Sequence, residues 1–168
     1  MDLKALRQIT CGLYVITSIK EGKFNGQIAN TVFQVTSEPT AIAVSINKQN
    51  PTYSFIRDSH VYTVSVLFRD APLSFIGNFG FKSGRETDKF ATLTYELGKN
   101  GAPIVMEHTL SYMEAEVVNE VDVGTHAIFI GNLVEAEILR TDEPMTYAYY
   151  HEVKRGTTPQ AAPTTWRI

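Results

Sequence analysis

Two long strand patterns near the end of the sequence constrain the fold most. Residues 110–121 and 125–139 are rich in β-branched and other apolar side chains, and Asp122-Val123-Gly124 separates them. A three-residue link that contains glycine is typical of a hairpin, so the two strands are expected to be neighbours in a sheet. Nowhere does the sequence repeat a strand–helix–strand alternation, which argues against a doubly wound parallel sheet.

Shorter strands and turns fill the rest of the chain. Lys20-Glu21-Gly22-Lys23 predicts a hairpin turn, because Gly22 adopts positive φ without penalty. Six or seven strands are expected in all, the others at residues 10–18, 23–36, 41–46 and 61–67, with short helices at 2–8, 51–59, 70–80 and 144–150. Antiparallel sheets often protect their edge strands by closing into a barrel. The sequence therefore predicts a mainly β protein, a β-barrel with peripheral short helices.

Length and composition limit the classes of function. With 168 residues, 43% of them hydrophobic, the chain is expected to form a single domain over residues 1–168, with 155–168 as an extended tail. A dispersed net charge of −3 argues against a nucleic-acid partner. No apolar run approaches the roughly 20 residues that cross a bilayer, and no signal-peptide core is present, so a cytoplasmic protein without a membrane partner is expected.

Residues that bind metals or act as nucleophiles are sparse. Cys11 is the only cysteine, which excludes an internal disulfide and thiolate metal clusters, and it is interpreted as a core residue of the strand at 10–18. The four histidines are too far apart in the sequence to form a helical metal pair. Dinucleotide-binding, Walker and serine-elbow motifs are also missing. No metal site is expected.

The first of three polar, acid-poor stretches covers residues 23–36. Amide and hydroxyl side chains punctuate an apolar pattern there, at Asn25, Gln27, Asn30, Thr31, Gln34 and Thr36. Such groups can hold a polar heterocycle and its phosphate tail. The alternative is an ordinary strand whose polar residues face solvent, and the stretch alone does not decide between the two.

The other two stretches contain groups that suit an anion. Residues 45–52 place hydroxyl, amide and ammonium groups at a strand end and a helix start, where anions bind readily. Residues 82–89 combine Gly84 with the cations of Lys82, Arg85 and Lys89, although acids at 86 and 88 leave a solvated charged loop as the alternative. Together, the stretches favour a phosphorylated cofactor over acid–base or covalent chemistry by the protein.

His126 is the histidine best placed for chemistry. It follows the turn at 122–124 and opens a strand. At a barrel mouth its imidazole would touch a bound anion or a reacting ring, whereas a surface histidine at a strand start is the alternative.

These motifs resemble those of the flavin reductase-like family and follow the same order. The segment Asn25-Gly26-Gln27-Ile28-Ala29-Asn30-Thr31-Val32-Phe33-Gln34-Val35-Thr36-Ser37-Glu38-Pro39 is similar to the family signature. The likeness continues over nearly the whole chain, through residues 47–50, 79–90, 101–103 and 122–131. Residues 145–151 and 154–156 resemble the branch found in rubredoxin-fused NAD(P)H oxidoreductases and flavoredoxin-like proteins. The resemblance implies an antiparallel Greek-key, FMN-binding split barrel.

The resemblance also implies the site residues. The positions expected to bind the cofactor are Gln27, Ala29, Asn30, Thr31, Ser45, Ile46, Asn47, Asn50, Thr52, Ser83, Gly84, Lys89 and Phe90. In family members, the positions around Asn50 and Thr52 lie near the phosphate. His126 matches a histidine near the flavin and the nicotinamide and is the expected catalytic residue.

A flavin reductase is the implied activity. FMN, with FAD as the alternative, would carry electrons from NAD(P)H to free flavin or a redox protein. A flavoredoxin-type carrier reduced by a protein donor is the second hypothesis, and a barrel that binds another ligand is the third. Because Cys11 cannot supply a four-cysteine iron domain, a rubredoxin or diiron flavoprotein partner would be a separate polypeptide. A homodimer is expected, with surface offered by Tyr147, Tyr149, Tyr150 and Trp166.

Overall fold

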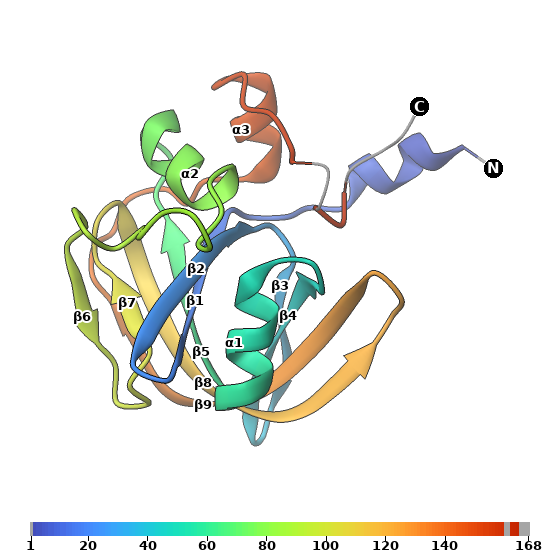
Figure 1. Cartoon of the computed structure of the whole chain (residues 1–168). Coiled ribbons are helices and arrows are strands. Elements are labelled where there is room, and N and C mark those ends of the chain that lie inside the picture. Colours follow the sequence, from blue (N-terminus) through green and yellow to red (C-terminus); the bar gives the residue numbers. More distant parts are fainter. Residues whose placement is uncertain (1, 160–161, 165–168) are drawn as a thin grey trace.

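The computed structural model describes residues 2–159 and 162–164, and it is built around one curved sheet (Figure 1). In spatial order, the seven strands of this sheet are β2 (Lys23–Ala29), β1 (Tyr14–Lys20), β5 (Val61–Leu67), β8 (Thr109–Asp122), β9 (His126–Ile138), β4 (Thr40–Asn47) and β3 (Val32–Ser37). Neighbouring strands pair antiparallel throughout. The prediction of a mainly β, antiparallel fold is confirmed.

The two edge strands of this sheet are consecutive in the sequence. Only Asn30 and Thr31 separate β2 from β3, although these strands stand at opposite ends of the strand order. The sheet must therefore curl until its two edges approach each other at this link. The Ser45 amide donates to the Thr31 carbonyl at 3.2 Å and extends the β3–β4 pairing up to the link. The result is a barrel with a split between its edges, as the family resemblance implied.

The β8–β9 hairpin joins the two halves of the barrel. β8 pairs with β5 on one side, and β9 pairs with β4 on the other. The register between β8 and β9 shifts at Glu114/Ala115 and at Val117/Asn119. Such irregularities bend a strand and increase its twist, so the two long strands can belong to both halves. This hairpin is the one predicted from residues 110–121 and 125–139.

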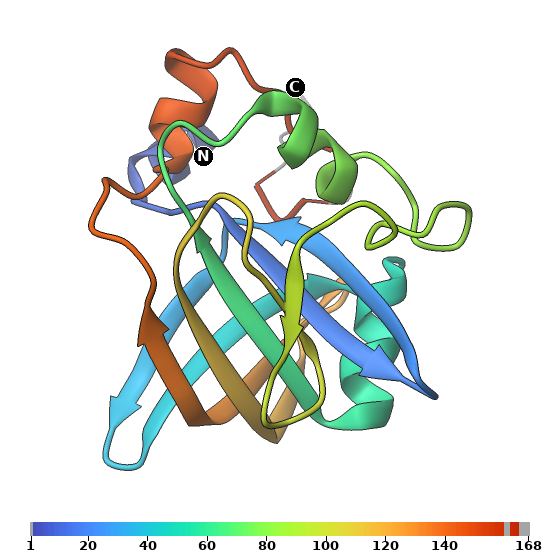
Figure 2. The same ribbon diagram turned by 90° about the vertical axis from the view of Figure 1, so that its left-hand side faces the viewer.

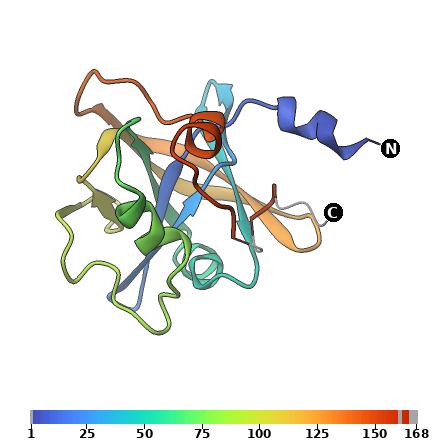
Figure 3. The same ribbon diagram turned by 90° about the horizontal axis from the view of Figure 1, so that it is seen from above.

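Short helices cover one end and one side of the barrel. α2 (Leu73–Gly80) and α3 (Tyr147–Glu152) lie over the upper end in Figures 1 and 2, and α1 (Pro51–Ser59) packs beside β1 and β2. The 3₁₀ helix η1 (Leu3–Gln8) extends away from the barrel in Figure 3. No helix among the described residues is long and apolar enough to span a membrane.

Two apolar cores stabilise this arrangement. The barrel interior packs side chains such as Ile16, Val64 and Phe129. The second core lies under α2 and α3 and includes Phe79 and Tyr150. Burial of these apolar side chains stabilises both the barrel and the helices at its upper end.

The structure corrects three predictions. β6 (Tyr95–Leu97) and β7 (Pro103–Val105) form a small second sheet that was not predicted, because three-residue strands carry no period-two pattern. Residues 23–36 form two strands at opposite edges rather than one strand and its continuation. Cys11 precedes β1 instead of lying inside a strand. It is half-buried, and burial raises the pKa of its thiol, which does not favour a nucleophile.

The region of α3 also differs from its prediction. The helix begins at Tyr147 rather than residue 144, because the Thr146 Oγ1 caps it by accepting from the Tyr149 amide at 3.1 Å. Tyr150 is buried inside the chain, so it offers no surface to a partner. Trp166 lies outside the described residues.

Candidate functional site

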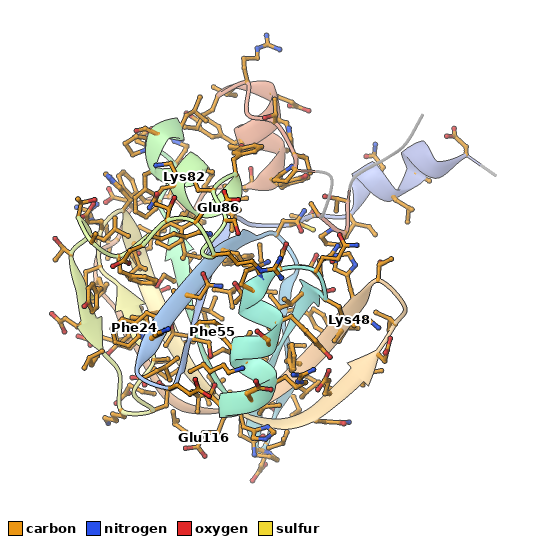
Figure 4. The ribbon with its side chains drawn as sticks, in the orientation of Figure 1. Phe24, Lys48, Phe55, Lys82, Glu86 and Glu116 are labelled. Atoms are coloured by element: carbon orange, nitrogen blue, oxygen red, sulfur yellow. The ribbon has the colours of Figure 1, made fainter. Side chains whose placement is uncertain are left out.

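A cavity of about 240 Å³ opens where the barrel split meets the helices at its upper end. Its walls come from β2 and β4, from the start of α1, from the end of α2 with the following loop, and from α3 with the C-terminal residues. Figure 4 labels Lys82 and Glu86 on the loop after α2, and Lys82 is one of the lining residues. Segments far apart in the sequence thus converge on one cavity.

Most of the predicted site residues line this cavity. They are Gln27, Ala29, Asn30, Ser45, Asn47, Asn50, Thr52, Ser83, Gly84, Lys89 and His126. Thr31, Ile46 and Phe90 are not among the lining residues. Ile46 packs in the barrel interior, because strand residues alternate in direction and its two neighbours face the cavity, and Phe90 packs in the second core. Their roles toward a cofactor stay predictions.

One end of the cavity, which we call the α1 end, is formed by Asn25, Gln27, Thr52 and Gly84. The Asn25 side chain is 3% exposed, and its Nδ2 donates to the Thr52 Oγ1 at 3.2 Å. Among the described residues, the buried Asn25 Oδ1 and Gln27 Oε1 have no hydrogen-bond partner. Buried polar atoms are normally bonded, so these two oxygens are acceptors suited to donors of a ligand.

The start of α1 adds features that favour an anion. The first turn of α1 contains no acidic residue, and Pro51 occupies its first position. Asn50 stands at the N-cap as predicted, but its side chain makes no capping hydrogen bond. The first backbone N–H groups of a helix lack intrahelical acceptors and carry the positive end of its dipole. Arg85 lies close by, since its guanidinium donates to the Gln49 carbonyl at 3.4 Å.

Lys89 lies in the cavity wall, and its ammonium group hydrogen-bonds backbone carbonyls. Its side chain is 6% exposed, and its Nζ donates to the carbonyls of Gly26 at 2.7 Å and Phe79 at 3.2 Å. Burial lowers the pKa of Lys89 to about 8, because a charged ammonium is poorly solvated there. The lysine therefore ties β2 to α2, and this link fixes the wall in which Gln27 stands.

His126 reaches the same cavity from β9. It pairs with Asn47 of β4 in the register of the sheet, and both residues line the cavity. The His126 ring is 9% exposed, with Nδ1 at 2.9 Å from the Thr125 Oγ1. A nearly buried imidazole in this position can hydrogen-bond a ligand ring, and the interpretation of a surface histidine does not fit its burial.

The opposite end, which we call the strap end, is formed by Asn30, Tyr147 and the C-terminal strap, defined as residues 157–159 and 162–164. Thr158, Pro159 and Pro163 of this strap line the cavity. The Asn30 Nδ2 donates to the Thr164 Oγ1 at 2.9 Å. Figure 3 shows the red end of the chain over the barrel, on the side of α2 and α3. The tail was predicted to be extended, but residues 162–164 form a bend and a turn, with the Ala162 amide donating to the Pro159 carbonyl at 3.0 Å. The tail also lies on the site.

Several lining residues were not among the predicted site residues. Asn25 and Arg85 belonged to stretches already noted for their polar groups, so a wider choice within those stretches would have included them. Tyr147 and Thr158 carried no signal of cofactor binding in the sequence. Among the described residues, no three His, Cys, Asp or Glu side chains gather closely enough to hold a metal ion.

Comparison with known sequences points to one family. The family described as "Flavin reductase like domain" matches residues 6–158. The chain is 60% identical to the high molecular weight rubredoxin of Moorella thermoacetica over 98% of this chain and 72% of that protein. It is 48% identical to the ferric-chelate reductase (NAD(P)H) of Archaeoglobus fulgidus over 96% of each protein.

A solved structure with the same fold supports the barrel assignment. The NADH:FAD oxidoreductase SgcE6 of Streptomyces globisporus C-1027 superimposes with a TM-score of 0.77. The alignment covers 86% of each chain at 21% sequence identity. At this identity the likeness concerns the fold alone.

Proposed function

The chain belongs to the flavin reductase-like family, and from this premise we propose that it is an FMN-binding oxidoreductase that takes electrons from NAD(P)H. Family membership rests on the match over residues 6–158 and on the two relatives above 45% identity. Membership supports a flavin-dependent electron-transfer activity. The choice of FMN over FAD, the contacts and the partners are the parts that we propose.

The observation that carries the proposal is the pair of unpartnered amide oxygens at the α1 end. Asn25 Oδ1 and Gln27 Oε1 are buried acceptors without a donor among the described residues. They line a cavity whose wall also includes the start of α1. A flavin mononucleotide has hydroxyl donors along its ribityl chain and a phosphate at the end of that chain. The hydroxyls could donate to the two oxygens while the phosphate meets the start of α1.

The orientation of the cofactor follows from β2. Asn25 contacts Thr52 of α1, and Asn30 contacts the C-terminal strap. Five residues of extended chain span about 16 Å, which is similar to the length of a flavin mononucleotide. With the phosphate near Asn50 and Thr52, the ring would therefore lie toward His126 and Asn30.

The chemistry itself would come from the cofactor. A bound flavin supplies a ring that accepts a hydride and passes electrons onward. The residues of this chain would bind the phosphate, orient the ring and limit access of water. His126, together with neutral donors such as Ser45 and Asn47, would stabilise negative charge near the ring.

We also propose a homodimer, for which the sheet offers an apolar surface. Phe33 and Val35 of β3 are 50% and 45% exposed, and Val118, Val121 and Val123 are exposed near the tip of the β8–β9 hairpin. An edge strand with exposed apolar side chains is suited to a second copy of the chain. Light scattering that gives a monomer would contradict the dimer.

We also propose that the protein is cytoplasmic and that it forms a single flavin-binding domain.

An anaerobic absorption experiment tests the main proposal. Purified protein loaded with FMN should show the flavin bands, and these should bleach on addition of NADH or NADPH. A bound flavin that bleaches with neither nicotinamide would instead indicate a carrier reduced by a protein donor. Candidate acceptors, namely free flavin, a ferric chelate or a rubredoxin, are then compared by the rate at which the bands return.

A further inference from the structure

The C-terminal strap is fastened by a run of side-chain hydrogen bonds. The Tyr147 hydroxyl lies 2.6 Å from the Thr158 Oγ1 and 2.9 Å from the Thr164 Oγ1. Thr158 in turn bonds the His151 Nε2 at 3.0 Å. One phenol of α3 thus holds both parts of the strap at once.

Further bonds fix the point where the strap leaves α3. The His151 Nδ1 donates to the Gly156 carbonyl at 2.9 Å, and the Tyr150 hydroxyl donates to the Thr157 carbonyl at 2.9 Å. A Cβ at Gly156 would overlap the Tyr150 ring, so the chain crosses this ring where only glycine fits. The strap therefore leaves α3 in a defined direction, toward the cavity.

The contacts at the strap end are those of a cover rather than of an occupant. The Asn30 Nδ2 donates to the Thr164 Oγ1, and the Asn30 Oδ1 accepts from the Thr31 Oγ1 at 3.0 Å. Both ends of this amide are thus satisfied by the chain itself. At the α1 end, by contrast, Asn25 Oδ1 and Gln27 Oε1 are left without a partner. The acceptors suited to a ligand therefore lie at the opposite end of the cavity from the hydrogen bonds of Thr158 and Thr164, so the strap closes the cavity without filling it.

We infer that the C-terminal strap is a cover over the ring end of the flavin site, and that Tyr147 is the positioning residue that keeps it closed. This inference rests on the proposed flavin site. A closed strap must release before a flavin, or a second planar molecule such as a nicotinamide, can reach the ring end. A group that only gates access changes the rates of entry and exit by the same factor and leaves the equilibrium nearly unchanged.

The test is a stopped-flow measurement of FMN binding to the apoprotein, followed by flavin fluorescence. Tyr147→Phe removes both hydroxyl bonds, so FMN association and dissociation should each become about fivefold to tenfold faster, while Kd changes less than twofold. Tyr149→Phe, which removes a hydroxyl two residues further along α3 and outside the fastening, is the matched control and should leave both rates unchanged. Thr158→Val should repeat the effect in part, and Thr158→Ser should restore wild-type rates.

The alternatives give different rate patterns. If only dissociation accelerates and Kd rises, Tyr147 contacts or supports the ligand and the cover is refuted. If only association accelerates and Kd falls, the strap competes for the site and the inference is again overturned. Unchanged rates in a folded Tyr147→Phe variant, judged by its melting temperature, also refute it. If the wild-type protein does not bind FMN, the proposed function and this inference are both overturned. If the wild type binds FMN and the Tyr147→Phe variant gives any of these patterns, only the inference is overturned.

Discussion

The two ends of the cavity differ in how their polar groups are satisfied. At the strap end, Asn30, Tyr147 and Thr158 bond to other groups of the chain. At the α1 end, the buried oxygens of Asn25 and Gln27 have no partner among the described residues. An unpartnered buried polar atom destabilises a protein by about 1–3 kcal/mol. The difference teaches that the α1 end keeps two buried acceptors at the expense of stability, as our proposal of a ligand there requires, whereas the strap end is stabilised by bonds within the chain.

Lys89 should give the largest effect, because its ammonium group donates to two backbone carbonyls beside the α1 end. Lys89→Met leaves the carbonyls of Gly26 and Phe79 without their donor, so the free energy of unfolding should fall by about 2–3 kcal/mol at pH 7. FMN affinity should fall less than tenfold. Chemical denaturation and FMN titration measure the two quantities, and a large loss of affinity without loss of stability would show that Lys89 acts on the ligand directly.

The same lysine predicts a pH dependence. Burial lowers the pKa of folded Lys89 to about 8, below the value near 10.5 of an exposed lysine. Between these values the unfolded chain binds one more proton than the folded chain, so the folded state gains stability as pH rises from about 8 to about 10. The stability of the wild type relative to Lys89→Met should therefore increase over this window. A constant difference would show that Lys89 has an ordinary pKa.

Gly84 tests the α1 end by filling it. A Cβ at this position would overlap the Asn25 Oδ1, whose amide is held by Thr52, so Gly84→Ala must displace a buried side chain. We expect FMN affinity to fall about 10-fold to 100-fold. Gly77→Ala is the matched control, because its added Cβ would meet no described atom within 4 Å apart from its chain neighbours and the backbone of its own helix. Equal affinities for the two variants would place the cofactor away from Asn25.

Substitution of Gln27 sharpens the comparison of the two ends, because we expect it to raise the stability of the ligand-free protein and to lower FMN affinity. Gln27→Met keeps the length of the side chain and removes an unpartnered oxygen. The ligand-free protein should become about 1 kcal/mol more stable, while FMN affinity falls about tenfold. Thermal melts of the apoprotein and FMN titration measure both. A variant that is less stable and binds normally would mean that Gln27 stabilises the fold and does not contact the ligand.

Thr31 should give the smallest effect. Its Oγ1 donates to the Asn30 Oδ1 and its side chain does not line the cavity. Thr31→Val should weaken FMN binding less than threefold, which corresponds to one indirect hydrogen bond. A loss of tenfold or more, measured by FMN titration, would establish a direct contact and would extend the ligand region into the strap end.

Sequence reasoning predicted the barrel better than the cavity. Turn chemistry at Gly22 and the long patterns at 110–121 and 125–139 are local, so the hairpins followed directly. The opposite placement of β2 and β3 depends on pairing across the whole sheet, which no local pattern around Asn30 encodes.

Within the site, local patterns indicated which polar residues line the α1 end, but they did not place the C-terminal strap over the other end. Polar residues clustered in the sequence around Asn50 and Gly84, and these do line the cavity. The proline-rich tail was expected to be extended, but its position over the cavity depends on Tyr147 meeting Thr158 and Thr164. A tyrosine and two threonines are common residue types, and only their arrangement in space makes them a fastening.

The path of the strap has a consequence for tethered partners. Because Thr164 is bonded to Asn30 in the cavity wall, any domain joined by a short link beyond this residue is confined to the neighbourhood of the strap end. Short flexible links produce effective local concentrations in the millimolar range. An electron-accepting domain attached there would meet the site far more often than the same domain free in solution. Even an acceptor that binds weakly could then receive electrons.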